Sequence, residues 1–237
     1  MSSARPGSPD RQRARTSGGE PRGLFLSFEG IEGSGKSTHA GRLAEHLAAA
    51  GHRVHLSREP GGTGLGEALR GLLLGVDGDP PVPEAELFLM LASRAQHAAR
   101  VILPRLNRGE IVITDRYADA SVAYQGGGRR LPMEWVEFGN RIATYGLEPD
   151  LRILVDVSMD EALERVERRR AREGQLDRFD QEDRAFYQRV QDAYRALSAG
   201  PGWHVVDSAA PAESVARAVI GAVEPWVARR DEAGALQ

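Results

Sequence analysis

The sequence predicts a three-layer α/β fold in which helices cover both faces of a five-stranded parallel sheet. Short apolar runs alternate with longer segments of helical periodicity, and the first run ends in a glycine-rich turn directly before a helical segment. Such alternation is typical of parallel sheets, because parallel strands need crossover connections. At 237 residues and 41% hydrophobic composition, we expect one domain, over residues 23–229.

Each strand is predicted from a short apolar run that ends at a turn signal. These runs cover residues 23–28, 53–57, 110–114, 151–157 and 203–206. Between and after them, apolar residues recur every three or four positions, which indicates helices that bury one face. The helical segments cover residues 36–50, 64–75, 83–106, 132–146, 158–171, 180–198 and 211–229.

The two ends of the chain lack the apolar residues that a core requires. Residues 1–22 contain five Arg and, after Met1, no aliphatic side chain larger than Ala, so we expect a disordered tail. This segment also lacks the apolar core of a secretory signal, and no stretch is apolar enough to span a membrane. We therefore expect a cytoplasmic protein without a membrane partner, and residues 230–237 are expected to fray.

Composition excludes several classes of function. The chain has no Cys, which rules out disulfides, thiolate metal sites and a cysteine nucleophile. Its formal net charge of −3 gives no general attraction for nucleic acid, so anion binding has to be local. Lys36 is the single lysine among 31 basic residues, which indicates that its position requires a compact ammonium group.

A phosphate-binding loop, or P-loop, is predicted between the first strand and the first helix. Its pattern G-x-x-x-x-G-K-[ST] matches Gly30, Ile31, Glu32, Gly33, Ser34, Gly35, Lys36 and Ser37, with Thr38 following. Loop N–H groups and Lys36 would hold the phosphates of a nucleoside triphosphate, and the Ser37 hydroxyl would bind Mg²⁺. The alternative is a chance glycine-rich turn. The motif alone leaves GTPase switches, motor ATPases and small-molecule kinases open.

Asp115 and Arg116 follow the apolar run at residues 111–114, at the strand edge where ligands of open α/β sheets bind. The Asp115 carboxylate can orient Mg²⁺ or its water, and Arg116 can grip a second phosphate through two hydrogen bonds. A simple cap of the strand end is the alternative for this pair.

Six strings in a fixed order resemble the thymidylate kinase family over residues 23–226. They are FEGIEGSGKST (28–38), SREPGGTG (57–64), LASRAQH (91–97), TDRY (114–117), SVAYQGGGR (121–129) and LDRFD (176–180). The resemblance implies a P-loop NTPase fold, usually as a homodimer. It also implies transfer of the γ-phosphoryl group of ATP to dTMP with Mg²⁺, so the expected partners are these two nucleotides and a second copy of the chain.

The resemblance also assigns residues to the acceptor nucleotide. It implies that Arg116 holds the dTMP phosphate and that Arg94 reads the thymine carbonyl. Ser121 and Gln125 would complete a hydrogen-bonded slot, and Tyr124 would lie beneath the sugar. Arg94 as a surface charge, Tyr124 as a core aromatic and Gln125 as a turn residue are the alternatives.

Further residues of these strings are expected around the acceptor. Glu59, Pro60 and Arg70 would line the dTMP phosphate and its water network. The chain departs from the family pattern at Met90, where the family usually has a Phe that stacks on thymine, and a thioether is a less rigid cover.

The string at residues 176–180 is expected beside the sugar and contributes Asp177, Phe179 and Asp180. The family usually has Glu in place of Asp180, and the shorter side chain is expected to reach the sugar hydroxyl only through water.

The densest Arg cluster of the chain lies at residues 165–174, and we expect a mobile lid at about residues 168–178. Phosphoryl transfer needs positive side chains that stabilise the negative charge on the migrating group. The P-loop itself contains no Arg, and in this respect the chain resembles family members in which the lid supplies the arginine. Arg172 and Arg170 are the candidates, in that order. A solvated helix face is the alternative for any one of them. Glu32 is expected to be a water-mediated magnesium partner or a sugar contact, with a purely structural role as its alternative.

The sequence therefore predicts a dTMP kinase. A kinase acting on another pyrimidine nucleotide or nucleoside remains an alternative, as does a P-loop regulator without transferase activity. A GTPase would need the guanine-reading Asn-Lys-x-Asp, and the only lysine already belongs to the P-loop.

Overall fold

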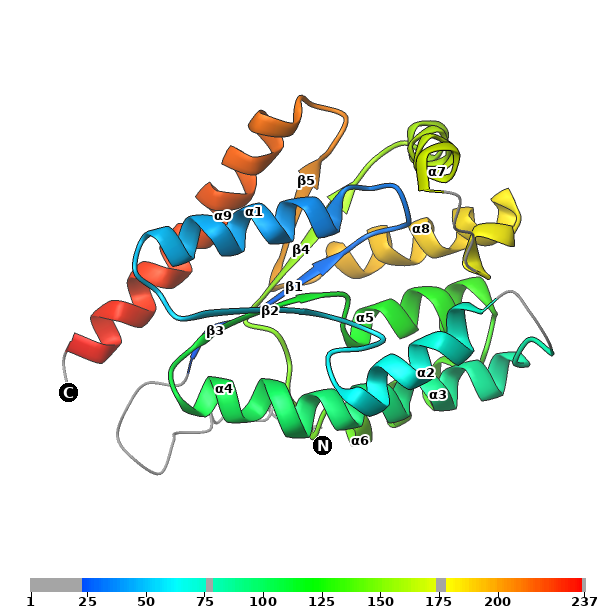
Figure 1. Cartoon of the computed structure of the whole chain (residues 1–237), viewed down its shortest axis with the longest axis horizontal. Helices are drawn as coiled ribbons and strands as arrows, with labels where there is room; N and C mark the ends of the chain where they lie inside the picture. The colour runs from blue at the N-terminus through cyan, green and yellow to red at the C-terminus, as the bar shows by residue number, and fades with distance from the viewer. Residues whose placement is uncertain (1–22, 76–78, 174–177, 236–237) are drawn as a thin grey trace, which may run out of the picture.

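The structure, a computed structural model, describes residues 23–75, 79–173 and 178–235. The predicted tail at residues 1–22 lies outside these ranges. Within them, five parallel strands form one sheet in the order β2-β3-β1-β4-β5, which confirms the predicted fold class (Figure 1). The strands are β1 Phe25–Glu29, β2 Val54–Arg58, β3 Ile111–Asp115, β4 Leu151–Asp156 and β5 Trp203–Asp207.

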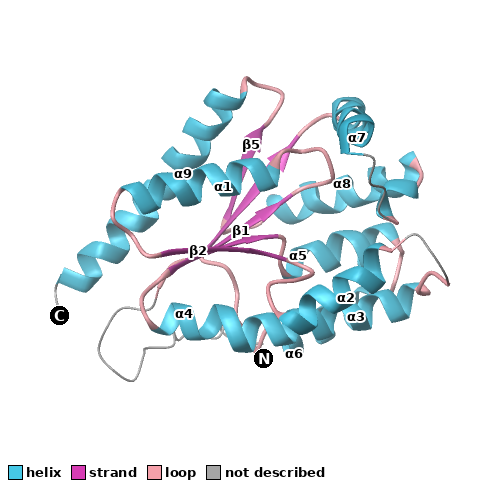
Figure 2. Cartoon of the chain, viewed as in Figure 1, coloured by secondary structure: helices cyan, strands magenta, loops and turns pink. Residues whose placement is uncertain are grey.

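Helices lie on both faces of the sheet and complete the three layers (Figure 2). Their bounds are α1 Lys36–Ala49, α2 Gly64–Leu74, α3 Pro83–His97, η1 Ala98–Ile102, α4 Leu103–Asn107, α5 Ala118–Ser121, η2 Val122–Gly128, α6 Met133–Ala143, α7 Met159–Glu173, η3 Phe179–Gln181, α8 Arg184–Ser198 and α9 Ala212–Ala235. On one face, α1 and α9 bury Leu43 and Val219 against Leu26 of β1. On the other, Leu106 of α4 packs with Phe25 of β1.

All five strands end on a charged residue. These residues are Glu29, Arg58, Asp115, Asp156 and Asp207. The register places Arg58 opposite Asp115 and Asp156 opposite Asp207, so the charges gather at the carboxyl edge of the sheet. Ligands of open α/β sheets bind at this edge, and the P-loop leaves β1 there.

A helical segment at residues 118–128 was not predicted. α5 continues into the π-helical turns of η2, although three consecutive glycines disfavour a helix. The glycines instead allow close packing by α8. A Cβ on Gly127 would lie 2.9 Å from that of Ala193, and one on Gly128 would lie 2.5 Å from the Phe186 ring. Tertiary packing therefore outweighs local propensity here.

Several helix ends also differ from expectation. The segment predicted at residues 83–106 forms three consecutive pieces, α3, η1 and α4. α8 begins at Arg184, four residues later than predicted, because the Asp183 carboxylate accepts the N–H of Phe186 and caps the helix. α9 continues to Ala235, so residues 230–235 are helical where fraying was expected; the Arg229 guanidinium stacks over Trp226 in this part of the helix. Across the described ranges, we find no helix with the length and apolarity to cross a bilayer.

Candidate active site

The loop between β1 and α1 has a backbone shape that favours glycine. Gly30, Gly33 and Gly35 have φ angles of 143°, 76° and 91°. A Cβ on Gly33 would lie 2.3 Å from the carbonyl oxygen of Ala162, so neighbouring α7 also excludes a side chain at this position. The loop can therefore turn its N–H groups inward, as a phosphate cradle requires.

The polar side chains of the motif lie at the N-terminus of α1. Ser37 and Thr38 are exposed, whereas Ile31 and Ser34 are buried. Lys36 is only 5% exposed, and its Nζ lies 3.5 Å from the carbonyl oxygen of Ile31. Because a helix N-terminus also carries positive partial charge, this end of α1 is suited to bind an anion.

Glu32 lies among three cations. Its carboxylate is 3.8 Å from Lys36 Nζ, 3.1 Å from Arg116 and 3.6 Å from Arg169. The Lys36 ammonium, followed by the two guanidinium groups, holds the pKa of Glu32 well below its usual range despite burial. Burial in turn lowers the pKa of Lys36. The Glu32 carboxylate is thus already paired with three cations, and its role as a magnesium partner stays a prediction.

Ser37 and Asp115 meet at the carboxyl edge of the sheet. The Ser37 hydroxyl donates a hydrogen bond to Asp115 Oδ2, while the buried Oδ1 has no hydrogen-bond partner within the described ranges. Hydroxyl and carboxylate oxygens are the donors that Mg²⁺ prefers, so this pair fits the ion. The described residues contain no cluster of three or more His, Cys, Asp or Glu that could hold a metal without further oxygen ligands.

Arg116 joins the P-loop to the acceptor side. It has a φ of 71°, which is unusual for a bulky residue and places its side chain back across the loop. One nitrogen donates to the carbonyl oxygen of Gly30 at 2.9 Å, and the other to the hydroxyl of Tyr124 at 2.9 Å. The guanidinium also stacks over the Tyr124 ring, 4.6 Å from its centroid.

Arg94 is 1% exposed and is not a surface charge. Nε donates to Glu59 at 2.8 Å, NH1 donates to Ser121 and Asn140, and NH2 donates to the carbonyl oxygen of Tyr117. These bonds use four of the five N–H donors of a guanidinium. They fix Arg94 rigidly, and Ser121 acts here as its acceptor.

Glu59 also binds His97, which the sequence analysis did not select. Its Oε1 lies 2.9 Å from His97 Nδ1, and Nε2 of the same ring lies 2.9 Å from Ser57 Oγ. His97 follows Arg94 by three residues on α3, so the helical spacing was the available signal. The charge of Arg94 and the contact with His97 hold the pKa of Glu59 below its usual value against the opposing effect of burial. The Glu59 carboxylate is thus committed to Arg94 and His97.

The remaining acceptor residues lie in an apolar cluster with Tyr124 or, for Arg70, against the backbone of Pro60. Tyr124 is 5% exposed, and its ring meets that of Phe179 edge to face at 5.6 Å. Met90 is partly buried in the same apolar cluster. Arg70 donates to the carbonyl oxygen of Pro60 at 3.1 Å.

Gln125 donates from Nε2 to Glu86, a second buried carboxylate that the sequence analysis did not select. Glu86 is fully buried on α3 and also accepts hydrogen bonds from Arg129 and Arg178. Its position in the sequence, amid the apolar residues of the segment 83–106, gave no signal of these distant partners.

The lid arginines on α7 have different surroundings. Arg170 pairs with Glu167 at 2.6 Å, Arg172 is exposed, and Arg169 is the one that approaches Glu32. Arg165, four residues before Arg169, donates to Ser208, whose hydroxyl in turn donates to the P-loop carbonyl of Ser34. α7 is therefore tied to the P-loop by Arg165.

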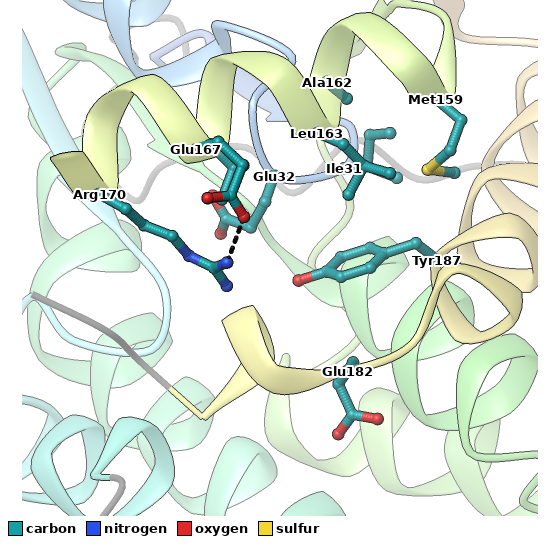
Figure 3. Close-up of a pocket in the computed structure, with 10 residues that line it drawn as sticks. Ile31, Glu32, Met159, Ala162, Leu163, Glu167, Arg170, Glu182 and Tyr187 are labelled. Carbon is teal, nitrogen blue, oxygen red and sulfur yellow. Dashed lines mark hydrogen bonds and ion pairs between the residues drawn. The ribbon is translucent and has the colours of Figure 1, made fainter.

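A cavity of about 160 Å³ lies between α7, the P-loop and the start of α8. Figure 3 shows Ile31 and Tyr187 on its apolar side, with Glu32, Arg170 and Glu182 around its polar side. Its walls thus combine the P-loop with the candidate lid. Of the other predicted residues, Asp177 and the segment 174–177 of the lid lie outside the described ranges, as does the side chain of Asp180.

Comparisons with known proteins agree with this arrangement. A family model described as thymidylate kinase matches residues 28–219. The chain is 48% identical over 206 residues to a thymidylate kinase of Nitratidesulfovibrio vulgaris strain DP4, covering 84% of this chain and 92% of that protein. It is 43% identical over 210 residues to one of Pseudomonas putida strain GB-1, covering 88% and 98%.

A solved structure supports the same relationship. The crystal structure of thymidylate kinase from Ehrlichia chaffeensis superposes with a TM-score of 0.69 at 31% identity, covering 86% of this chain and 99% of that one. The family match at residues 28–219 includes the P-loop, the candidate acceptor residues and α7. On these grounds the chain belongs to the thymidylate kinase family.

Proposed function

We propose that this protein is a thymidylate kinase, which transfers the γ-phosphoryl group of ATP to dTMP and releases dTDP and ADP. The observation that carries the proposal is the position of Arg116. One guanidinium contacts both Gly30 of the P-loop and Tyr124 of the acceptor side. A phosphate donor and a phosphate acceptor would therefore meet at a shared cation.

The reaction needs positioning and charge rather than covalent chemistry from the protein. An oxygen of the dTMP phosphate attacks the γ-phosphorus, and the bond to the β–γ bridging oxygen breaks. Lys36 and the loop N–H groups hold the β- and γ-phosphates, and Arg116 binds the acceptor phosphate. Arg172 or Arg170 brings charge to the migrating group from α7 and helps to exclude water.

Mg²⁺ is the proposed metal. Ser37 and Asp115 would hold it, directly or through water, and the unpartnered Oδ1 of Asp115 supports this assignment. When bound, the ion neutralises phosphate charge. The tight electrostatic environment of Glu32 favours a role in orienting Lys36 and Arg116.

One donor and one acceptor among the candidate acceptor residues support thymine as the base. Arg94 keeps one N–H beyond its four protein bonds, and Gln125 Oε1 is a buried acceptor without a hydrogen-bond partner in the described ranges. Thymine presents a carbonyl oxygen next to an N–H on its pairing edge, which matches this pair. Met90 would cover the ring, and Tyr124 would lie beneath the sugar.

The first test is ADP release by the purified protein with ATP and Mg²⁺ and, in turn, dTMP, dUMP, UMP, CMP, AMP and GMP. We expect kcat/KM for dTMP to exceed that for every other acceptor. A preference for another monophosphate would keep the kinase and reject the thymidylate assignment. ATP binding without acceptor-dependent turnover would instead indicate a regulator.

A homodimer is also proposed, with α6 and α3 at its centre. Trp135, Phe138 and Ile142 recur every three or four residues on α6 and are 51%, 60% and 61% exposed. Phe88 of the neighbouring α3 is 68% exposed. An apolar helix stripe with this exposure is typical of a protein interface, and the family resemblance names a second copy as its occupant.

A cytoplasmic location completes the proposal. Its support is the reaction itself, since ATP and dTMP are nucleotides of that compartment. The location stays a prediction until the protein is localised in its own cell.

A further inference from the structure

Glu86 gathers three donor side chains, two from η2 and its C-terminal end and one from the segment after α7. Its carboxylate is 0% exposed on α3 and accepts a hydrogen bond from Gln125 Nε2 at 2.7 Å. Arg129 donates from Nε at 3.1 Å, and Arg178 donates from NH2. Because an ionised carboxylate only accepts hydrogen bonds, every group that contacts it has to present a donor.

This contact fixes which end of the Gln125 carboxamide faces Glu86. Only the nitrogen of the amide can donate, so the oxygen has to point away from Glu86. That oxygen, Oε1, is buried and has no hydrogen-bond partner in the described part of the chain. A buried acceptor without a partner favours any ligand that brings it an N–H or O–H group.

We infer that Glu86 is a positioning residue that sets the hydrogen-bond polarity of the base slot, by holding the nitrogen of Gln125 so that its oxygen meets the pyrimidine. The inference rests on the proposed function, in which Gln125 lies beside the base. It adds a residue that touches no substrate and yet determines the preference for thymine over cytosine.

The fixed polarity distinguishes thymine from cytosine. Position N3 of thymine carries a hydrogen, which Gln125 Oε1 can accept. Position N3 of cytosine carries a lone pair, which would face the same oxygen and repel it. The neighbouring exocyclic group also changes from a carbonyl to an amino group, which opposes the N–H of Arg94. Uracil has the same pairing edge as thymine, so Glu86 cannot separate dUMP from dTMP.

A purely structural role for Glu86 makes a different prediction. The carboxylate balances the charges of Arg129 and Arg178, and Arg129 is also paired with Glu182 at 2.5 Å. If charge balance were its whole contribution, its loss would weaken the protein and slow all acceptors alike. The selectivity between dTMP and dCMP would then stay constant.

The test is the substitution Glu86→Gln, measured as kcat/KM for dTMP, dUMP and dCMP. The new amide offers both a donor and an acceptor, so the Gln125 carboxamide can flip and present its nitrogen to the base. We expect the dTMP/dCMP ratio to fall by a factor of about ten to a hundred, the value of one buried hydrogen bond. The dTMP/dUMP ratio should stay at its wild-type value, because both bases present the same edge.

Two further variants complete the test. Glu182→Gln removes the other partner of Arg129 without contacting Gln125, and it should leave the dTMP/dCMP ratio unchanged. Glu86→Asp keeps the negative charge between the arginines but withdraws the carboxylate by one methylene. It should lower the ratio even if Glu86→Gln does not fold.

The outcomes separate this inference from the proposed function. A wild-type protein that does not phosphorylate dTMP would reject the function itself. A wild-type protein that prefers dTMP, with an unchanged dTMP/dCMP ratio in the folded Glu86 variants, would overturn the inference alone. An equal fall in Glu182→Gln would assign the effect to the charge network and also overturn it.

Discussion

Glu29, the last residue of β1, is a buried carboxyl group that contacts residues around the candidate active site. It is 0% exposed; its Oε1 accepts the N–H of Tyr117 at 2.9 Å, and its Oε2 accepts the hydroxyl of Tyr194 at 3.0 Å. The same hydroxyl accepts a hydrogen bond from Arg116. Burial, reinforced by the charge of Asp119, raises the pKa of Glu29 to about 8 and outweighs the opposing charge of Arg116.

This raised pKa predicts a pH dependence of stability. In the folded protein the pKa of Glu29 is raised to about 8, whereas in the unfolded chain this carboxyl group has its ordinary pKa of 4.5. The contribution to the free energy of unfolding is therefore complete below pH 4.5 and is lost as the pH rises towards 8. Glu29→Gln should remove this part of the slope.

Urea unfolding at intervals from pH 5 to pH 9 measures the effect as the difference between wild type and Glu29→Gln. Taking the difference cancels the other titrating groups, including His55, whose pKa burial lowers to about 4. Parallel curves for the two proteins would show that Glu29 does not titrate in this range.

Local sequence was sufficient to select Lys36, Asp115 and Arg116 as candidate residues. Lys36 belongs to the P-loop motif at the start of α1, and Asp115 and Arg116 lie at the end of β3 and directly after it. Glu29 and Glu86 were missed because their burial depends on distant segments: Tyr194 lies 165 residues beyond Glu29. When a single carboxylate occurs within an apolar run, the local sequence does not indicate which distant residue will contact it.

At the scale of elements, α7 is the helix that contacts the P-loop and carries the arginines of the predicted lid. Arg165 anchors it to Ser208 and the P-loop, while Arg169, one turn further along the helix, reaches Glu32. The sequence predicted this helix and its charge, but it could not say which arginine faces the loop. The rotation of the helix about its own axis, relative to the P-loop, decides which arginine faces the loop. That rotation depends on tertiary packing.

The lid arginines carry a kinetic prediction. Arg172→Ala, and to a lesser extent Arg170→Ala, should lower kcat for dTMP phosphorylation while changing KM for dTMP much less. A charge that acts on the migrating phosphoryl group is used in the transition state rather than in binding. For an arginine of this kind the loss is on the order of 10³-fold.

Arg168→Ala is the matched control, because Arg168 is exposed on the same helix and donates a hydrogen bond to the backbone carbonyl oxygen of Glu164. Steady-state kinetics of the three variants should leave this control near wild type. Equal losses in all three would indicate a general effect of lid charge, and no loss in any would make the cluster a solvated helix face.

At the scale of the whole molecule, the sheet was predicted correctly because an apolar run that ends at a turn signal recurs five times along the sequence. Alternating strands and helices determine the parallel architecture, and one misplaced helix end does not change it. What local patterns could not provide is the segment at 118–128, where packing of Phe186 and Ala193 on glycines overrides propensity. The sequence of α6 likewise does not show which of its apolar residues are exposed, because that depends on which face of the helix packs against the rest of the protein.

The proposed dimer predicts that Phe138→Asp weakens self-association. Phe138 is 60% exposed, so the substitution should leave the fold intact, while a charge buried at an interface should raise the dimer Kd by a factor of about 30 or more. Sedimentation equilibrium measures the constant. Val205→Asp, an equally polar change on the exposed strand β5, should not alter it. A monomeric wild-type protein at high concentration would exclude the dimer.

The burial of Lys36 limits how this protein reacts with reagents that modify primary amines. Within the chain, primary amines are limited to the α-amino group and one lysine that is 5% exposed. Acylating reagents, aldehyde crosslinkers and amine-coupled sensor surfaces therefore have almost a single point of attack, at the start of the chain. Coupling by that route would leave the phosphate cradle unmodified. Acylation at Lys36 would in turn report opening of the loop.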